Sequence, residues 1–226
     1  MKLRRWIDGL VAGCALVAAS PVIAAAAVAV KLSSPGPAFF MAPRVGQGGD
    51  LFLMYKLRTM HCRSSPGSSI TSAVDPRVFA VGRLLRKLKI DELPQLLNIV
   101  KGQMAIVGPR PEAPDIVEKH YTEDYHRSLD VPPGLTSPGS IYYYTDGERL
   151  LETTQLDAEQ AYFQQLLPAK MQIDLDYLQR ATLWSDLGVV LQTAAVLAGK
   201  VLGRKTKTIE NPSACLEKCQ RSGHAA

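Results

Sequence analysis

The sequence contains few cysteines and few aromatic residues, with 4 cysteines among 226 residues and only 7% Phe, Trp and Tyr. Four scattered cysteines do not make the disulfide framework of a small secreted domain. Glycine and proline, at 17 and 15 residues, are too scarce for a collagen-like chain, and 46% hydrophobic residues exclude an intrinsically disordered one. The length suits one domain plus an additional segment, with enough residues to bury a core.

The sequence also lacks a recognisable zinc-binding pattern. A site could be assembled only from residues that do not show the usual ligand spacing: His61, Cys62, Cys215, Cys219 and His224. We therefore expect reduced cysteines in a cytosolic setting.

Basic residues exceed acidic residues by 26 to 21, which gives a net charge of +5. This excess suits an anionic partner such as nucleic acid, a phosphorylated small molecule or an anionic membrane surface. It suits a mildly basic, solvated surface equally well, so the charge alone does not choose among these classes.

One long apolar run is present, from Ile7 to Val30, interrupted by Asp8 and by Ser20-Pro21. As a helix of about 24 residues it would reach about 36 Å, enough to cross a hydrocarbon core of about 30 Å. Three interpretations stay open: a cleaved signal peptide, a single spanning helix, or a re-entrant segment that returns to the face it entered from. Basic residues at both ends leave the positive-inside rule without a preferred side.

Pro21 predicts a bend in this helix. Proline has no N–H to offer the carbonyl four residues earlier, and its ring clashes with that carbonyl. In lipid the freed carbonyl is costly, and the hydroxyl of Ser20 is one of the few groups near enough to relieve it.

A β-hairpin is predicted after the apolar segment. Residues 38–41 and 51–55 are apolar and flank the glycine-rich turn 46–50. Pro43 cannot donate a ladder hydrogen bond, so the first strand is expected to be short or to lie at an edge.

Apolar residues with helical spacing predict a helix over residues 81–88, with basic residues on its other side. A second helix is predicted to begin with Asp91 as its N-cap and to end at Gly102. Glu92 suits the positive end of that helix, and Pro94 is tolerated in its first turn. On this basis alone, the two acidic residues could simply cap a core helix.

The loop Gly108–Pro111 is too rigid for a helix and presents the guanidinium of Arg110. Another loop, over residues 132–139, is followed by a predicted strand at Ile141–Tyr144. The tail, residues 204–226, is expected to be disordered. Further helices are predicted over residues 158–167, 170–178 and 184–202, the last with an apolar face that suits a core or a membrane interface.

Several short motifs gain meaning from their order and spacing. They are Ser20-Pro21, Gly36–Phe40, Arg44–Gly46, Tyr55–Met60, Asp75–Arg77, Gly82–Lys87, Asp91–Asn98 and Val107–Pro111. Together they resemble the bacterial sugar transferase family, the monotopic phosphoglycosyl transferases, over about residues 2–201. Longer members of that family carry a multi-span domain before this core, so the chain is expected to be the minimal form.

The resemblance implies an α+β fold class: a mainly helical, membrane-associated domain with a re-entrant helix-break-helix, a small β-hairpin and amphipathic interfacial helices. The expected organisation is a re-entrant membrane segment at 1–32, a catalytic domain at 33–203 and the tail at 204–226.

The resemblance also implies the reaction, which is transfer of a sugar 1-phosphate from a UDP-sugar to polyprenyl (undecaprenyl) phosphate with release of UMP. This would be the first membrane step of a bacterial surface glycan pathway, at the cytoplasmic face of the inner membrane. The expected partners are the UDP-sugar, polyprenyl phosphate and membrane lipid, without nucleic acid, and a homo-oligomer is left open.

In the family, the aspartate that corresponds to Asp91 is the nucleophile and forms a covalent aspartyl-phosphosugar. Glu92 completes the catalytic pair, and both residues are expected to hold or orient Mg²⁺, the expected cofactor. An aspartate is ionised at neutral pH without a general base, but it must attack an anionic diphosphate, so nearby cations are needed. The expected phosphate-binding residues are Lys56, Arg58, Arg86 and Arg110, with Pro109 and Pro111 in a nucleotide-site loop.

Two other functions compete with this one. The chain could be a membrane-tethered binding protein whose basic patch contacts anionic lipid, or an exported enzyme behind a signal peptide. A binding protein would tolerate Asp91→Asn, whereas a transferase would lose turnover.

Overall fold

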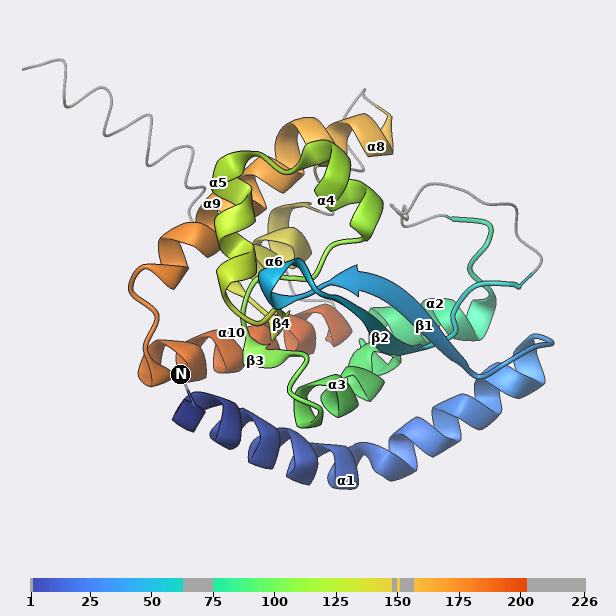
Figure 1. Cartoon of the computed structure of the whole chain (residues 1–226). Helices are drawn as coiled ribbons and strands as arrows, with labels where there is room; N and C mark the ends of the chain where they lie inside the picture. Colours follow the sequence, from blue (N-terminus) through green and yellow to red (C-terminus); the bar gives the residue numbers. More distant parts are fainter. Residues whose placement is uncertain (1, 63–74, 148–149, 151–156, 203–226) are drawn as a thin grey trace, which may run out of the picture.

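The computed structural model describes residues 2–62, 75–147, 150 and 157–202. A mainly helical body lies along one side of a long N-terminal helix, α1 (Figure 1). The α-helices are α1 (Lys2–Ser33), α2 (Ala80–Lys87), α3 (Leu96–Val100), α4 (Pro114–His120), α5 (Glu123–His126), α6 (Pro138–Tyr142), α8 (Ala158–Ala161), α9 (Leu167–Leu178) and α10 (Leu183–Val201). Tighter or wider helical turns are η1 (Gln47–Gly49), η2 (Ile90–Gln95), η3 (Arg127–Asp130), η4 (Tyr143–Gly147) and η5 (Tyr162–Leu166).

Helix α1 is continuous through Pro21, so the predicted interruption is a bend and not a break. Figure 1 shows both ends of the helix curving toward the rest of the domain. The Oγ atom of Ser20 donates a hydrogen bond of 2.8 Å to the carbonyl of Val17, which is the carbonyl that Pro21 leaves without a partner. The predicted relief of the freed carbonyl by Ser20 is therefore confirmed.

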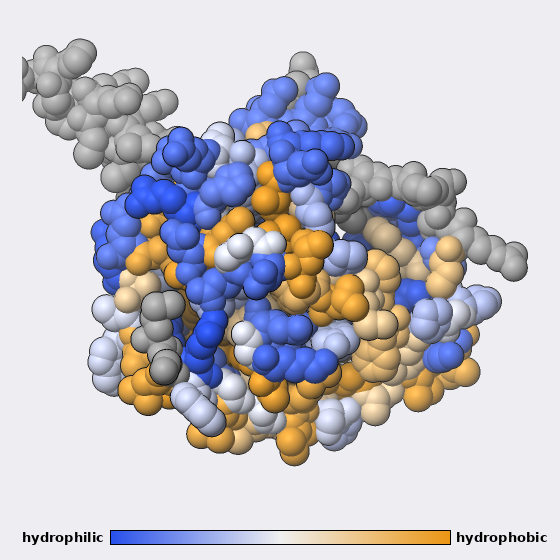
Figure 2. Space-filling view, viewed as in Figure 1, coloured by the Kyte–Doolittle hydropathy of each residue, from blue (hydrophilic) through white to orange (hydrophobic). Residues whose placement is uncertain are grey.

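Small residues form the inner side of α1 and larger apolar residues form its outer side. Ala12, Ala26 and Val30 are buried against the body, where the cores beneath α2 and α3 meet the helix. The exposed side carries Leu3, Trp6, Leu10, Val17, Val28 and Leu32. Figure 2 shows apolar residues along the lower edge of the molecule, where Figure 1 places α1. Within the described residues, α1 has the length and composition needed to cross a membrane.

The predicted β-hairpin is confirmed. Strands β1 (Phe39–Val45) and β2 (Leu51–Leu57) pair antiparallel, with Phe39 opposite Leu57 and Val45 opposite Leu51. Pro43 lies within β1, opposite Leu53, and a two-stranded sheet accommodates it because both strands are edge strands.

A second pair of strands was not predicted. Strand β3 (Ala105–Val107) pairs in parallel with β4 (Gly134–Thr136), inside the segment expected to be a loop. The strands are three residues long, too short for a periodic pattern to reveal. Gly134 permits the pairing, since a Cβ there would lie 2.1 Å from the backbone nitrogen of Gly108.

The predicted strand at Ile141–Tyr144 is wrong. These residues lie in α6 and the π-helical turn η4. Ser137 caps α6 by accepting a hydrogen bond from the N–H of Ser140, and Pro138 occupies the first helical turn. These start signals outweigh the strand propensity of the tyrosines.

The other predicted elements correspond closely to the structure. Helices α2, α9 and α10 lie where apolar periodicity placed them. Gly102 ends the segment after α3 with a φ of 73°, a conformation that a residue without Cβ adopts easily. The expected disordered tail lies outside the described residues, as do Cys215, Cys219 and His224 of the unfavoured zinc site.

Candidate active site

Asp91 and Glu92 lie in the first turn of η2, immediately after α2. The residue before this turn is Lys89, whose backbone is left-handed at φ 57°. Asp91 is therefore not the N-cap of a helix, contrary to the prediction. The left-handed residue lets the chain turn directly from α2 into a 3₁₀ helix, which leaves no extended residue at which a side-chain cap could form.

Glu92 lies among three cations. Its Oε1 atom is 2.7 Å from Nη2 of Arg110, 3.6 Å from Nζ of Lys56 and 3.7 Å from Nζ of Lys89. Burial by itself would raise the pKa of this carboxyl, but Arg110, followed by Lys89 and Lys56, holds the pKa well below its usual range. Glu92 is therefore ionised whenever these cations are present.

Asp91 has a different environment although it is the next residue in the chain. Burial, followed by the charge of Glu92, raises the pKa of the Asp91 carboxyl, while Lys56, Lys89 and Arg86 oppose the rise. Within the described residues, the Oδ1 atom of Asp91 is buried and has no hydrogen-bond partner. A buried carboxylate oxygen without a partner is unfavourable, and a bound cation or an electrophile would satisfy it.

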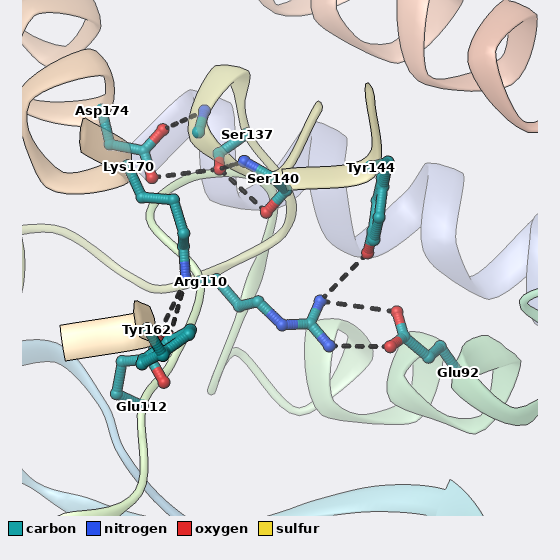
Figure 3. Close-up of polar contacts among 10 residues, drawn as sticks. Glu92, Arg110, Glu112, Ser137, Ser140, Tyr144, Tyr162, Lys170 and Asp174 are labelled. Atoms are coloured by element: carbon teal, nitrogen blue, oxygen red, sulfur yellow. Dashed lines mark hydrogen bonds and ion pairs between the residues drawn. The ribbon is translucent and has the colours of Figure 1, made fainter. Parts of the chain in front are cut away.

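The loop that carries Arg110 is held at both ends by backbone hydrogen bonds. The Pro109 carbonyl accepts from the N–H of Gly134 at 2.8 Å, and the Glu112 carbonyl accepts from the N–H of Val45 at 3.1 Å. Figure 3 shows Arg110 extended from this loop toward Glu92 and Tyr144. The predicted rigid presentation of one guanidinium is what the structure shows.

Behind the loop lies a buried polar cluster. Nζ of Lys170 in α9 is 2.8 Å from Oε1 of Glu112, and the hydroxyl of Tyr162 donates to the same oxygen at 2.8 Å. Figure 3 places this cluster on the opposite side of the loop from the Arg110–Glu92 pair. The same loop is thus bound to η2 through Arg110 and to α9 through Glu112, two residues later.

Pro109 and Pro111, predicted to line a nucleotide site, border a cavity of about 10 Å³ that Arg110 and Tyr121 also line. Such a volume holds about one water molecule. The cavity bordered by Pro109 and Pro111 is therefore too small for a nucleotide. Asp91 itself is only 6% exposed.

Of the four cations predicted to bind phosphate, the structure brings three together. Lys56, Arg86 and Arg110 surround the two carboxylates, and burial lowers the pKa of Lys56 to about 8. Arg86 donates from Nε to Oγ1 of Thr59 at 2.9 Å. The structure therefore places these three residues beside Asp91 and Glu92, and their binding of phosphate stays a prediction.

Arg58 lies elsewhere. Its guanidinium is buried and donates to Oγ and the carbonyl of Ser34 and to the carbonyl of Pro37. These contacts fasten the segment after α1 to the end of β2. These contacts give no support to the phosphate-binding role predicted for Arg58, because its guanidinium nitrogens already donate to Ser34 and Pro37.

Two residues that contact the site were not among the predicted catalytic or phosphate-binding residues: Lys89 and Tyr144. The Lys89 ammonium lies 4.1 Å from the ring centroid of Tyr144, and the Tyr144 hydroxyl is 3.4 Å from Nη1 of Arg110. Lys89 stands two residues before Asp91 at the end of a basic run, which was a usable signal. Tyr144 lies 53 positions beyond Asp91, and only the fold brings it there.

The described residues contain no group of three or more His, Cys, Asp and Glu side chains that could hold a metal ion. Asp91 and Glu92 offer two carboxylates. Mg²⁺ is commonly bound by one or two carboxylates together with water and substrate phosphate, so this pair fits such an ion once a phosphorylated substrate is present.

A sequence profile for the bacterial sugar transferases matches residues 1–200. The chain belongs to this family. It is 39% identical over 202 residues to a UDP-glucose:undecaprenyl-phosphate glucose-1-phosphate transferase of Caulobacter vibrioides, covering 87% of this chain and 70% of the relative. A protein of the same name from Xanthomonas campestris pv. campestris is 37% identical over 204 residues, covering 88% of this chain and 38% of the relative.

A third relative carries a different sugar in its name. The UDP-N-acetylgalactosamine-undecaprenyl-phosphate N-acetylgalactosaminephosphotransferase of Aeromonas hydrophila is 35% identical over 195 residues, covering 84% of this chain and 42% of the relative. The chain thus spans most of the Caulobacter protein but less than half of the other two. Relatives of similar identity differ in the sugar named, so membership of the family leaves the donor sugar open.

Proposed function

We propose that the protein transfers a sugar 1-phosphate from a UDP-sugar to undecaprenyl phosphate, giving a polyprenyl diphosphosugar and UMP. The observation that carries the proposal is the pair formed by Asp91 and Glu92, in which one carboxylate is neutralised by cations and the other keeps a buried oxygen without a partner. Family membership and the names of the relatives support the substrates.

The proposed reaction has two steps on one carboxylate. An oxygen of Asp91 attacks the phosphorus that bears the sugar, and the bond from that phosphorus to the oxygen bridging to UMP breaks, so UMP leaves with the electron pair. An oxygen of undecaprenyl phosphate then attacks the same phosphorus, and the bond to Asp91 breaks to restore the carboxylate. Neither step needs an additional oxidant, reductant or base.

Charge neutralisation is the main contribution of the other residues. Phosphoryl transfer depends mostly on positioning and on compensation of negative charge. Arg110, Lys56 and Arg86 are proposed to contact the phosphates, and Glu92 to keep Arg110 and Lys56 in place. Mg²⁺, held by Asp91 and Glu92 with substrate phosphate, would supply further compensation for the developing charge.

We further propose that α1 is a re-entrant membrane segment on the cytoplasmic face of the inner membrane. Both ends of the helix are fastened to the same body, by the Arg4–Asp186 ion pair at the start and by the hydrogen bonds of Arg58 to Ser34 at the end. A spanning helix would separate its ends by the bilayer thickness. The exposed apolar residues Trp184, Leu187 and Leu191 of α10 would lie in the interface.

The reaction is tested by UMP release from a panel of UDP-sugars with undecaprenyl phosphate, starting with UDP-glucose and UDP-N-acetylgalactosamine. Wild-type protein should release UMP only with the acceptor at steady state, and magnesium removal should stop turnover. Asp91→Asn should stay folded and lose turnover. Release at the wild-type rate by Asp91→Asn would refute the nucleophile, whereas absence of UMP release by the wild type with every donor would favour the binding-protein alternative.

The covalent step is tested separately by intact-protein mass spectrometry. Incubation with donor alone should add the mass of one sugar phosphate to the wild type and nothing to Asp91→Asn. The membrane proposal is tested in a cysteine-free background with single cysteines at Leu3 and Ser33, both exposed ends of α1. Labelling of the two positions from opposite sides of the membrane would contradict a re-entrant helix.

A further inference from the structure

Lys89 has an unusual backbone conformation directly before the catalytic pair. Among the described residues it is the non-glycine residue with a positive φ, at 57°. A side chain with a Cβ rarely adopts this conformation, because the Cβ approaches the following carbonyl. Such residues cluster at functional sites, where the surrounding structure holds them in place.

The conformation directs the Lys89 ammonium over a buried aromatic ring. Its Nζ atom lies 4.1 Å from the ring centroid of Tyr144, well within cation–π range. Tyr144 is 6% exposed, and Nζ of Lys200, from the end of α10, lies 5.5 Å from the same ring. The Lys89 ammonium therefore contacts both the Tyr144 ring and the Glu92 carboxylate.

The contact between Lys89 and Glu92 is an ion pair and not a hydrogen bond. At 3.7 Å it exceeds hydrogen-bond length, whereas Arg110 already donates to the same oxygen at 2.7 Å. An ammonium group has three donors. Arg110 already compensates most of the negative charge of Glu92, and Lys89 adds a further positive charge beside it.

The number of charged side chains at the site also concerns the role of Lys89. The cations around the catalytic pair are Lys56, Arg86, Lys89 and Arg110. Four cations beside two carboxylates leave an excess of two positive charges among these side chains, before any bound Mg²⁺ is counted, and this excess favours an anionic diphosphate. Without Lys89 the excess would be one.

We propose, building on the proposed transferase function, that Lys89 binds a phosphate oxygen of the substrate and that the ring of Tyr144 is a positioning element for its ammonium. The phosphate belongs either to the donor or to the lipid acceptor. Both present the same oxyanion, and steady-state kinetics separate them, since kcat/KM for each substrate reports its own half-reaction in a two-step transfer.

The first test replaces the charge without disturbing the backbone. Asparagine tolerates the left-handed conformation, so Lys89→Asn should keep the turn and fold, with its circular dichroism spectrum unchanged. Loss of one charged contact to phosphate should lower kcat/KM by about 10- to 100-fold for the substrate that Lys89 binds. Lys89→Arg should recover much of this loss. Lys87→Asn, which removes the same charge from an exposed position in α2, is the matched control.

The second test concerns Tyr144. Tyr144→Phe keeps the ring and should retain most of the activity, whereas Tyr144→Leu should lower kcat/KM as Lys89→Asn does. The double variant Lys89→Asn/Tyr144→Leu should be no slower than the slower single variant, because both changes remove the same placed charge.

Two results would overturn the proposal: kcat/KM of Lys89→Asn within twofold of Lys87→Asn for both substrates, or Lys89→Arg as slow as Lys89→Asn. In either case the residue only shapes the turn. The Asp91→Asn variant, assayed beside them, separates this failure from that of the reaction. If Asp91→Asn is inactive while Lys89→Asn is normal, the transferase stands and only the role of Lys89 fails.

Discussion

Asp174 gives a stability prediction whose size follows from the structure. This residue of α9 is 3% exposed, and its carboxylate accepts hydrogen bonds from the N–H of Gly139 at 2.8 Å and from Oγ of Ser137 at 3.1 Å. Burial raises the pKa of its carboxyl from 3.8 to about 6, and the hydrogen bonds oppose the rise only in part. The folded protein therefore binds a proton here more tightly than the unfolded chain does.

The sign of the pH effect follows directly. Because the folded pKa is raised, the contribution of Asp174 is fully favourable below pH 3.8 and is lost as the pH rises through about 6. The shift corresponds to about 3 kcal/mol, of which about 2.5 kcal/mol falls between pH 4 and pH 7.

Asp174→Asn should abolish this loss. Its amide can accept from Gly139 and donate to Ser137, whose own hydroxyl hydrogen then turns to Oγ of Ser140, 3.0 Å away. Urea unfolding in detergent, followed by circular dichroism, should show the variant gaining about 2.5 kcal/mol on the wild type between pH 4 and pH 7. Asp176→Asn, two residues along the same helix, is the matched control. Parallel pH profiles for Asp174→Asn and the wild type would refute the reasoning.

Three further predictions concern packing in the body and the bend in α1. Glu112→Gln should lower the free energy of unfolding by about 3–5 kcal/mol, because Lys170 stays buried without its carboxylate partner. Glu112→Gln/Lys170→Met should recover most of this loss, and a wild-type Tm for the single variant would contradict the prediction. Gly134→Ala should lower Tm strongly, because its Cβ would lie 2.1 Å from a backbone nitrogen. Gly188→Ala in α10, whose Cβ would meet nothing within 4 Å, should stabilise the protein by up to about 1 kcal/mol, and similar effects of the two variants would refute the close approach at Gly134. Pro21→Ala should straighten α1 by restoring the backbone hydrogen bond and place its two ends on opposite sides of the membrane, and unchanged cysteine labelling would argue that packing alone sets the bend.

Local features of this protein were readable from the sequence because their causes lie within a few residues. The hairpin, α2 and α10 follow from apolar spacing, and Gly102 ends its helical segment because glycine adopts a positive φ without strain. The bend in α1 and its relief by Ser20 involve one turn of helix. Wherever the interacting groups are close neighbours in the chain, the pattern of residue types is enough.

The composition of the candidate site was predicted only in part. Asp91, Glu92 and Arg110 belong to recognisable motifs, and the structure does place them together. Arg58 belongs to an equally clear motif, but its guanidinium serves the backbone after α1. A motif identifies a residue and its neighbours in sequence, and it leaves open which way the side chain points.

What only the tertiary structure decided concerns partners that are distant in the chain. Tyr144 was expected in a strand, but it lies in η4, directly after the helix α6 that Ser137 caps, and from there it contacts Lys89 and Arg110. The parallel pairing of β3 and β4 depends on close contact between two backbone segments, and strands of three residues are too short to show a pattern in the sequence. Such contacts are stable only when the rest of the core holds both sides at once, so no local pattern of residues specifies them.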